Sequence, residues 1–136
     1  MRRSGFTIIE LLVVIAIIGL LTTGVLVFLD STRTKSRDTR RMSDMQEIGK
    51  ALGLYIINND NFPVSAAPTT ITGDDAVSTA LEGDGVIVAM PTDPRHPTLS
   101  YTYQSDSAGR TYVLTFCLET DTIPGYAAGC DNTITP

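Results

Sequence analysis

Apolar residues dominate the first quarter of the chain and then recur at helical spacing. The run from Leu11 to Leu29 contains 19 residues and no charged side chain. As an α-helix it extends about 28 Å, close to the thickness of a bilayer core. Beyond it, apolar side chains return every three or four positions, at Met42, Met45, Ile48, Leu52, Tyr55 and Ile56. The pattern predicts one helix from about Thr7 to about Asn58, with a membrane-spanning first half and an amphipathic second half.

The segment after this helix begins with residues that end helices and then continues as a connection. Asn58-Asn59-Asp60-Asn61 and then Pro63 predict the end of the helix, because Asn and Asp compete for backbone hydrogen bonds and proline cannot continue the ladder. Residues 64–90 follow as a connection. Within it, Asp75 is expected to cap a short helix that ends at Gly83, and Val86–Ala89 is expected to be a strand.

The last third of the chain predicts a small sheet. Thr98–Gln104 and Thr111–Leu118 are rich in Tyr, Val and Thr and are separated by the turn Ser105–Gly109, which is a hairpin pattern. A third strand is expected after Cys130. The predicted fold class is therefore α+β: a long N-terminal spine helix packed on a small antiparallel β-sheet head.

One carboxylate interrupts the apolar start of the chain. Burying an ionised Glu in hydrocarbon costs several kcal/mol, so Glu10 is a candidate functional residue that needs a partner. A secretory signal carries its small-residue cleavage site after the apolar core, whereas Ser4 and Gly5 precede the apolar run here. Cleavage is therefore predicted upstream of the run, which leaves the apolar helix on the mature protein.

These residues resemble a known processing signal. The stretch Arg2-Arg3-Ser4-Gly5-Phe6-Thr7-Ile8-Ile9-Glu10-Leu11-Leu12-Val13-Val14 is similar to the class III leader of type IV pilins and type II secretion pseudopilins. The resemblance implies that prepilin peptidase cuts after Gly5, that Phe6 becomes the N-methylated terminus, and that Glu10 docks the subunit into a filament. A weaker similarity continues through Arg37–Arg41 and Asn61-Phe62-Pro63.

The resemblance also implies a domain organisation. Residues 1–5 are the cleaved leader, 6–29 the transmembrane or filament-core half of the spine helix, 30–58 its amphipathic half, and 59–136 the globular head. The expected location is the inner membrane as a single-pass protein with an extracytoplasmic head, and then an extracellular filament. The implied partners are copies of itself and other pilins, prepilin peptidase/methyltransferase, the inner-membrane assembly platform and, before assembly, the lipid bilayer.

The expected function is that of a structural subunit of a type IV pilus-like filament. The alternative within the family is a pseudopilin of a type II secretion system, and a further alternative is a single-pass membrane binding module that does not polymerise. Enzyme chemistry is not expected, because His96 is the only histidine and no phosphate-binding Gly loop is present. From Lys50 onward three basic residues stand against ten acidic ones, so direct nucleic-acid binding is not expected either.

A basic stretch follows the apolar run, and two cysteines lie near the C-terminus. The basic stretch Asp30–Arg41 is interpreted as solvated residues near lipid headgroups, with salt bridges to neighbouring subunits as the alternative. Cys117 and Cys130 would both lie on the oxidising side in the implied topology, so a disulfide of about 3 kcal/mol is expected rather than two free thiols.

No cofactor is expected. Some pseudopilins bind calcium in a loop beside the sheet, and the acidic residues that could serve here are Asp74, Asp75, Glu82 and Asp84. These residue types are more often helix caps and solvated turn residues, and their spacing is not that of an EF-hand.

Overall fold

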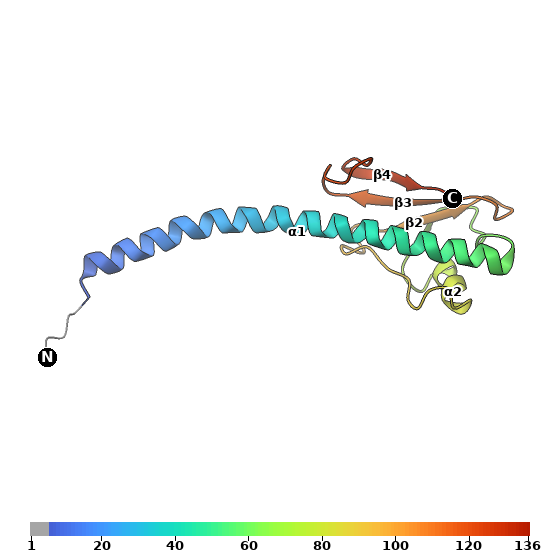
Figure 1. Cartoon of the computed structure of the whole chain (residues 1–136), viewed down its shortest axis with the longest axis horizontal. Coiled ribbons are helices and arrows are strands. Elements are labelled where there is room, and N and C mark those ends of the chain that lie inside the picture. Colours follow the sequence, from blue (N-terminus) through green and yellow to red (C-terminus); the bar gives the residue numbers. More distant parts are fainter. Residues whose placement is uncertain (1–5) are drawn as a thin grey trace. The chain divides into compact units, whose positions relative to one another are not determined.

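The computed structural model describes the backbone of residues 6–136 and the side chains of that range apart from residues 23–27. The chain divides into two compact units, Met1–Thr34 and Lys35–Pro136. Its elements are α1 (Ile8–Asn59), β1 (Thr69–Thr70), α2 (Ala76–Gly83), β2 (Thr102–Ser105), β3 (Tyr112–Leu118) and β4 (Gly129–Ile134), as Figure 1 shows. The predicted α+β class, with a long helix and a small antiparallel sheet, is confirmed.

The first unit is the N-terminal part of α1. Its apolar side chains are exposed by between 41% and 85%: Phe6, Ile8, Ile9, Leu11, Leu12, Val13, Val14, Ile15, Ile17, Ile18, Leu20, Leu21, Phe28 and Leu29. Among the described residues, no helix is both long and apolar enough to cross a membrane. The predicted span includes residues 23–27, whose side chains lie outside the described set, so the membrane assignment of residues 6–29 stays a prediction.

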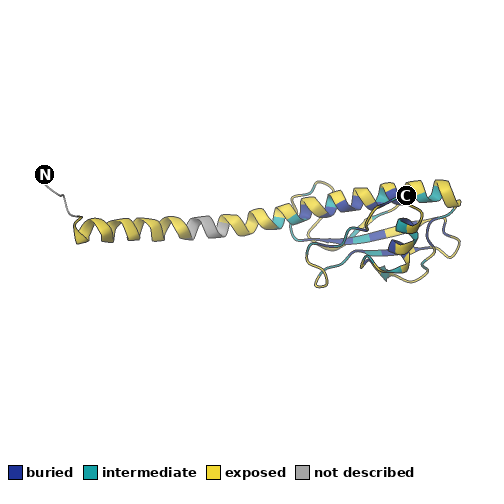
Figure 2. Cartoon of the chain, turned by 90° about the horizontal axis from the view of Figure 1, so that it is seen from below, coloured by how far each residue is buried: buried dark blue, intermediate teal, exposed yellow. Residues whose placement is uncertain are grey.

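The second unit is the head together with the part of α1 that packs on it. The four strands lie in the order β1-β2-β3-β4, and every neighbouring pair is antiparallel. Figure 2 shows buried residues in bands along this part of α1 and on the strands beside it. The predicted apolar face is confirmed: Met45, Ile48 and Leu52 are fully buried, and the remaining residues of the face pack against the same core.

The ends of the helices follow from local chemistry. The helix α1 ends at Asn59, and Asp60 adopts a positive φ of 62° while its N–H donates to the Ile56 carbonyl at 2.9 Å. This left-handed residue satisfies one of the last orphan carbonyls of the helix. Asp75 caps α2 by accepting from the N–H groups of Val77 and Ser78, and α2 ends at Gly83. Both predicted helix ends and the predicted cap are confirmed.

The predicted hairpin is also present, although β2 starts later than expected, at Thr102. Its register pairs Thr102 with Thr115 and Ser105 with Tyr112. Gly109 in the connecting turn has φ 64°, and a Cβ there would lie 2.6 Å from the Phe62 carbonyl oxygen. Glycine is therefore required where this turn meets the end of the spine helix.

The strand predicted at Val86–Ala89 is wrong. The N–H of Val86 donates instead to the Leu81 carbonyl of α2, and Ile87 alone of these residues is buried. Val88 is 99% exposed. A β-prone composition forms a strand only where a neighbour pairs with it, and this segment pairs with no strand and lines a groove together with residues of α1. The strand that joins the sheet from the connection is the two-residue β1, which the sequence pattern did not indicate.

Candidate functional site

The predicted docking residue Glu10 lies in the first turn of α1. Thr7 precedes the helix, and its N–H and hydroxyl both donate to Glu10 Oε2, at 3.0 and 2.8 Å. The N–H of Glu10 in turn lies 3.3 Å from the Thr7 hydroxyl oxygen. This reciprocal arrangement is a capping box, in which an N-cap Thr and a Glu three residues later satisfy each other's amides. The spacing was readable in the sequence, and it gives Glu10 a local role beside the docking role.

The other predicted processing residues lie at or beyond the edge of the described chain. Phe6 is 81% exposed and is the first described residue. Gly5 lies outside the described residues, so cleavage after Gly5 and methylation of Phe6 stay predictions.

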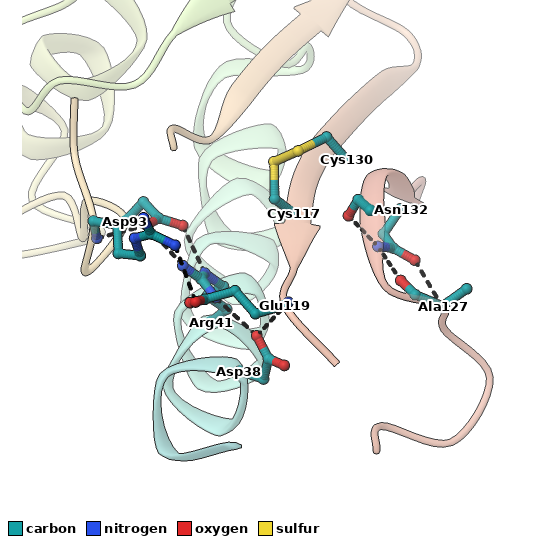
Figure 3. The surroundings of a disulfide bond; sticks show 10 residues. Asp38, Arg41, Asp93, Cys117, Glu119, Ala127, Cys130 and Asn132 are labelled. Atoms are coloured by element: carbon teal, nitrogen blue, oxygen red, sulfur yellow. Dashed lines mark hydrogen bonds and ion pairs between the residues drawn. A yellow bond between two sulfur atoms is a disulfide. The ribbon is translucent and has the colours of Figure 1, made fainter. Parts of the chain in front are cut away.

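A buried ion cluster joins α1 to the head at the start of the second unit. The side chain of Arg41 is completely buried and contacts three carboxylates, as Figure 3 shows. Its guanidinium donates to Asp38 at 2.8 Å, to both oxygens of Asp93 at 2.7 and 3.1 Å, and to Glu119 at 2.8 Å. Burial by itself lowers the pKa of Arg41, but the three hydrogen-bonded carboxylates outweigh it and raise that pKa.

Glu119 is the carboxylate that several arginines share. Arg37 donates to it through two nitrogens, at 2.7 and 2.6 Å, and Arg95 donates at 3.1 Å. The hydrogen bonds from Arg37, and after them those from Arg41, lower the pKa of Glu119 to about 2. The helix α1 and the connection at Arg95, far apart in the sequence, therefore meet on one ionised residue.

Asp38, which also belongs to this ion cluster, accepts hydrogen bonds from the backbone that follows β3. Its two oxygens accept from the N–H groups of Glu119 and Thr120, both at 2.9 Å, and from the Thr120 hydroxyl at 2.7 Å. Asp38 thus fixes the start of the loop between β3 and β4 on the surface of α1.

This cluster corrects the interpretation of the basic stretch. Arg37 and Arg41 were expected to be solvated or to pair with neighbouring subunits, whereas both bind carboxylates of the same chain. The sequence did contain a sign that Arg41 is buried. Arg41 precedes Met45 by four residues and Ile48 by seven, and this spacing places it on the buried face of α1. An arginine on an apolar face requires buried partners, but the sequence did not indicate which carboxylates they are.

The loop between β3 and β4 is closed by the predicted disulfide. Cys117 and Cys130 are bonded, which confirms the expected pairing. Inside the loop, the N–H of Ala128 donates to Asp121 at 2.6 Å, and the amide of Asn132 donates to the Ala127 carbonyl at 2.9 Å. The disulfide, Asp38 and these hydrogen bonds hold the loop in one conformation (Figure 3).

Three of the four acidic residues considered for calcium have separate partners within the head. Asp75 is the cap of α2, Glu82 accepts from the N–H of Met90 at 2.7 Å, and Asp84 accepts from the amide of Asn58 at 2.7 Å. Across the described residues, no three His, Cys, Asp or Glu side chains are grouped so as to hold a metal ion. The expectation that no cofactor is needed stays a prediction.

Comparisons with known proteins give matches to the N-terminal segment and to a longer part of the chain. Residues 1–26 match the family model of the prokaryotic N-terminal methylation motif. The motif, placed on a long helix that leads into a small antiparallel sheet, defines a subunit of the type IV pilin and pseudopilin class.

The similarity to curated proteins extends well beyond the motif. Over 102 residues the chain is 31% identical to type II secretion system core protein G of Aeromonas hydrophila, covering 68% of each chain. The protein of the same name from Pseudomonas aeruginosa is 32% identical over 102 residues, again covering 68% of each. That of Escherichia coli K12 is 29% identical over 101 residues, covering 68% of this chain and 67% of the relative. No solved structure gives a significant match. The chain belongs to the family of type II secretion system core protein G, whose members are pseudopilins.

Proposed function

We propose that this chain is a structural pseudopilin subunit that polymerises through its N-terminal helix as part of a type II secretion system. The observation that carries the proposal is the similarity to core protein G over 102 residues, because a match of that length is far longer than the N-terminal motif of residues 1–26 and must include part of the head. A pilus subunit would share the N-terminal motif, but the relatives that match beyond the motif carry secretion-system names. The pseudopilin alternative is therefore preferred to the type IV pilus reading.

The exposed surface of the first unit supports polymerisation. Fourteen large apolar side chains between Phe6 and Leu29 are exposed on the isolated chain. Soluble monomers rarely leave such a large apolar surface uncovered, and a lipid bilayer followed by the helices of other copies would cover it. In this function the subunit acts as a polymer component, with no catalytic step and no cofactor.

The proposal includes the processing and docking roles of the N-terminus. Prepilin peptidase removes residues 1–5, Phe6 becomes the methylated terminus, and the Glu10 carboxylate neutralises the Phe6 ammonium of an adjacent subunit. Two opposite charges about 4 Å apart gain roughly 4 kcal/mol at an effective dielectric constant of 20. The capping box holds the Glu10 side chain at the start of the helix, where this partner would arrive.

Two variants separate docking from capping. Glu10→Gln removes the charge but keeps a side chain that can complete the capping box, whereas Thr7→Ala removes the cap and keeps the charge. We expect Glu10→Gln to be processed normally and to form few filaments, and Thr7→Ala to form filaments close to the wild-type yield. The assay is electron microscopy of sheared filaments from cells lacking the wild-type copy, with intact-mass spectrometry to verify a mature chain beginning at methylated Phe6.

The opposite pattern would reduce Glu10 to a capping residue. If Glu10→Gln gave wild-type filament yield while Thr7→Ala did not, the charge would have no docking role. A mature protein that still carried Met1, or one cut after the apolar run, would refute the processing scheme and favour the non-polymerising membrane module.

A further inference from the structure

The end of the chain after β3 lies on the head without belonging to its buried core. Among the described residues, every buried apolar side chain lies between Met45 and Leu118. Residues 119–136, all of them described, include no buried residue, and Ile123, Tyr126 and Ile134 are only partly buried against the core. The strand β4 is also at the edge of the sheet. A segment that buries so little apolar surface opens more easily than the rest of a domain.

Two sets of contacts hold this segment in place. Its start is bound to α1, because Asp38 accepts from the N–H groups of Glu119 and Thr120 at 2.9 Å. Further along, the Cys117–Cys130 disulfide joins β4 to β3 (Figure 3). The contacts of Asp38 need no sulfur, so reduction leaves them intact. Without the disulfide, residues 121–136 depend on the hydrogen bonds between β3 and β4 and on those within the loop.

The two cysteines differ in how far solvent reaches them. Cys117 is only 7% exposed and stands in β3 between Phe116 and Leu118, which are both buried. Cys130 in β4 is exposed. Thiol–disulfide exchange requires a thiolate that an external sulfur can approach, and a buried apolar site hinders both the approach and the ionisation. On a folded, reduced head, Cys130 is therefore the thiol that an external disulfide meets first.

We propose that Cys130 is a thiol–disulfide exchange site on the folded head, at which an external disulfide reacts, and that Cys117 is its resolving residue. The core is complete up to Leu118, so the exchange takes place after the core has formed. The register of the sheet prepares the second step, since the paired positions Phe116–Asn132 and Leu118–Gly129 flank the two cysteines and hold them next to each other.

The exchange proceeds in two balanced steps. The Cys130 thiolate attacks one sulfur of the external disulfide, whose S–S bond breaks, and one thiol leaves while a mixed disulfide forms on Cys130. The Cys117 thiolate then attacks Cys130 Sγ, and the second thiol leaves. Two electrons pass from the two cysteines to the external disulfide, and the two cysteine protons end on the released thiols.

The exchange controls how firmly the end of the chain is attached to the sheet. An external thiol reverses both steps through the same mixed disulfide on Cys130 and frees residues 121–136 to open while the core stays folded. This chemistry goes beyond the filament function and does not depend on polymerisation. It gives the head two states that differ in one edge strand and one loop.

A matched pair of variants tests which cysteine reacts. Cys117→Ser and Cys130→Ser each keep one thiol, and the tyrosine band in near-ultraviolet circular dichroism verifies that both heads are folded. The full-length reduced chains, in detergent micelles, are mixed with glutathione disulfide and followed by intact-mass spectrometry. Cys117→Ser should accumulate the mixed disulfide at least about tenfold faster than Cys130→Ser, because only its thiol is exposed. In denaturing urea the two rates should become equal.

Hydrogen exchange tests the two states of the head. Reduced wild type and Cys117→Ser/Cys130→Ser should both exchange faster than the oxidised wild type within residues 121–136, with the amides of β3 and of residues 41–56 unchanged. Equal rates of the two single variants on the folded head, or a rate difference that persists in urea, would overturn the assignment of Cys130. Faster exchange throughout β3 and residues 41–56 would also overturn the proposal, because the core would then need the disulfide to fold.

Discussion

Removing Arg41 should be among the most damaging single substitutions in the head. In Arg41→Met the apolar stem is roughly preserved, but the fully buried carboxylates of Asp38 and Asp93 lose the cation that compensates them. Breaking a buried ion pair by removing one partner costs about 3 to 5 kcal/mol, because an uncompensated buried charge remains. For a unit of about 100 residues, each kcal/mol lowers the melting temperature by roughly 4 to 8 °C. We therefore expect a fall of at least about 12 °C.

The assay can be confined to the head in the full-length protein. All five tyrosines, at positions 55, 101, 103, 112 and 126, lie in the second unit. The tyrosine band in near-ultraviolet circular dichroism, followed during heating in detergent micelles, therefore reports unfolding of this unit. Arg40→Met is the matched control, since it removes the same charge from the exposed neighbouring position and should change stability by less than about 0.5 kcal/mol.

A conservative variant separates charge from geometry. Arg41→Lys keeps the charge but has no planar fork to bind both oxygens of Asp93, so its melting temperature should fall between those of the wild type and Arg41→Met. The reasoning would be refuted if Arg41→Met melted within about 3 °C of the wild type, or if Arg40→Met were equally destabilising.

Two further predictions concern the loop that Arg41 holds. The folded-state pKa of Glu119, about 2, lies below its ordinary value near 4.3, so its contribution is fully present above about pH 4.3 and is lost as the pH falls toward 2. Urea titrations between pH 7 and 2.5 should show the wild type losing about 2 kcal/mol more than Glu119→Gln, because at pH 2.5 the carboxylate is still partly ionised in the folded state, whereas parallel curves would contradict the shared ion pairs. Reducing the Cys117–Cys130 bond should lower the tyrosine-detected melting temperature by an amount equivalent to about 3 kcal/mol. The reductant should have no effect on Cys117→Ser/Cys130→Ser, and an unchanged midpoint in the reduced wild type would show that the disulfide does not stabilise the head.

Several features of the fold could be predicted from the sequence because they depend on neighbours within a few residues. The apolar positions from Met45 to Leu52 recur at helical spacing, so they predicted which face of α1 is buried. The helix end near Asn59 and the cap at Asp75 follow from side chains that hydrogen-bond the adjacent backbone. The capping box of Thr7 and Glu10 is equally local. It was not predicted, because Glu10 was considered only as a charged residue at the start of an apolar helix.

The tertiary structure decided the features that need partners distant in the sequence. Val86–Ala89 has a strand-like composition but finds no strand to pair with, while two threonines at 69 and 70 do. The periodicity around Arg41 places it on the buried face, yet its partners come from the connection at Asp93 and from the loop at Glu119, 52 and 78 residues away. Local spacing determines which side of a helix is covered, but only the folded chain brings together the opposite charges that make burial of that arginine favourable.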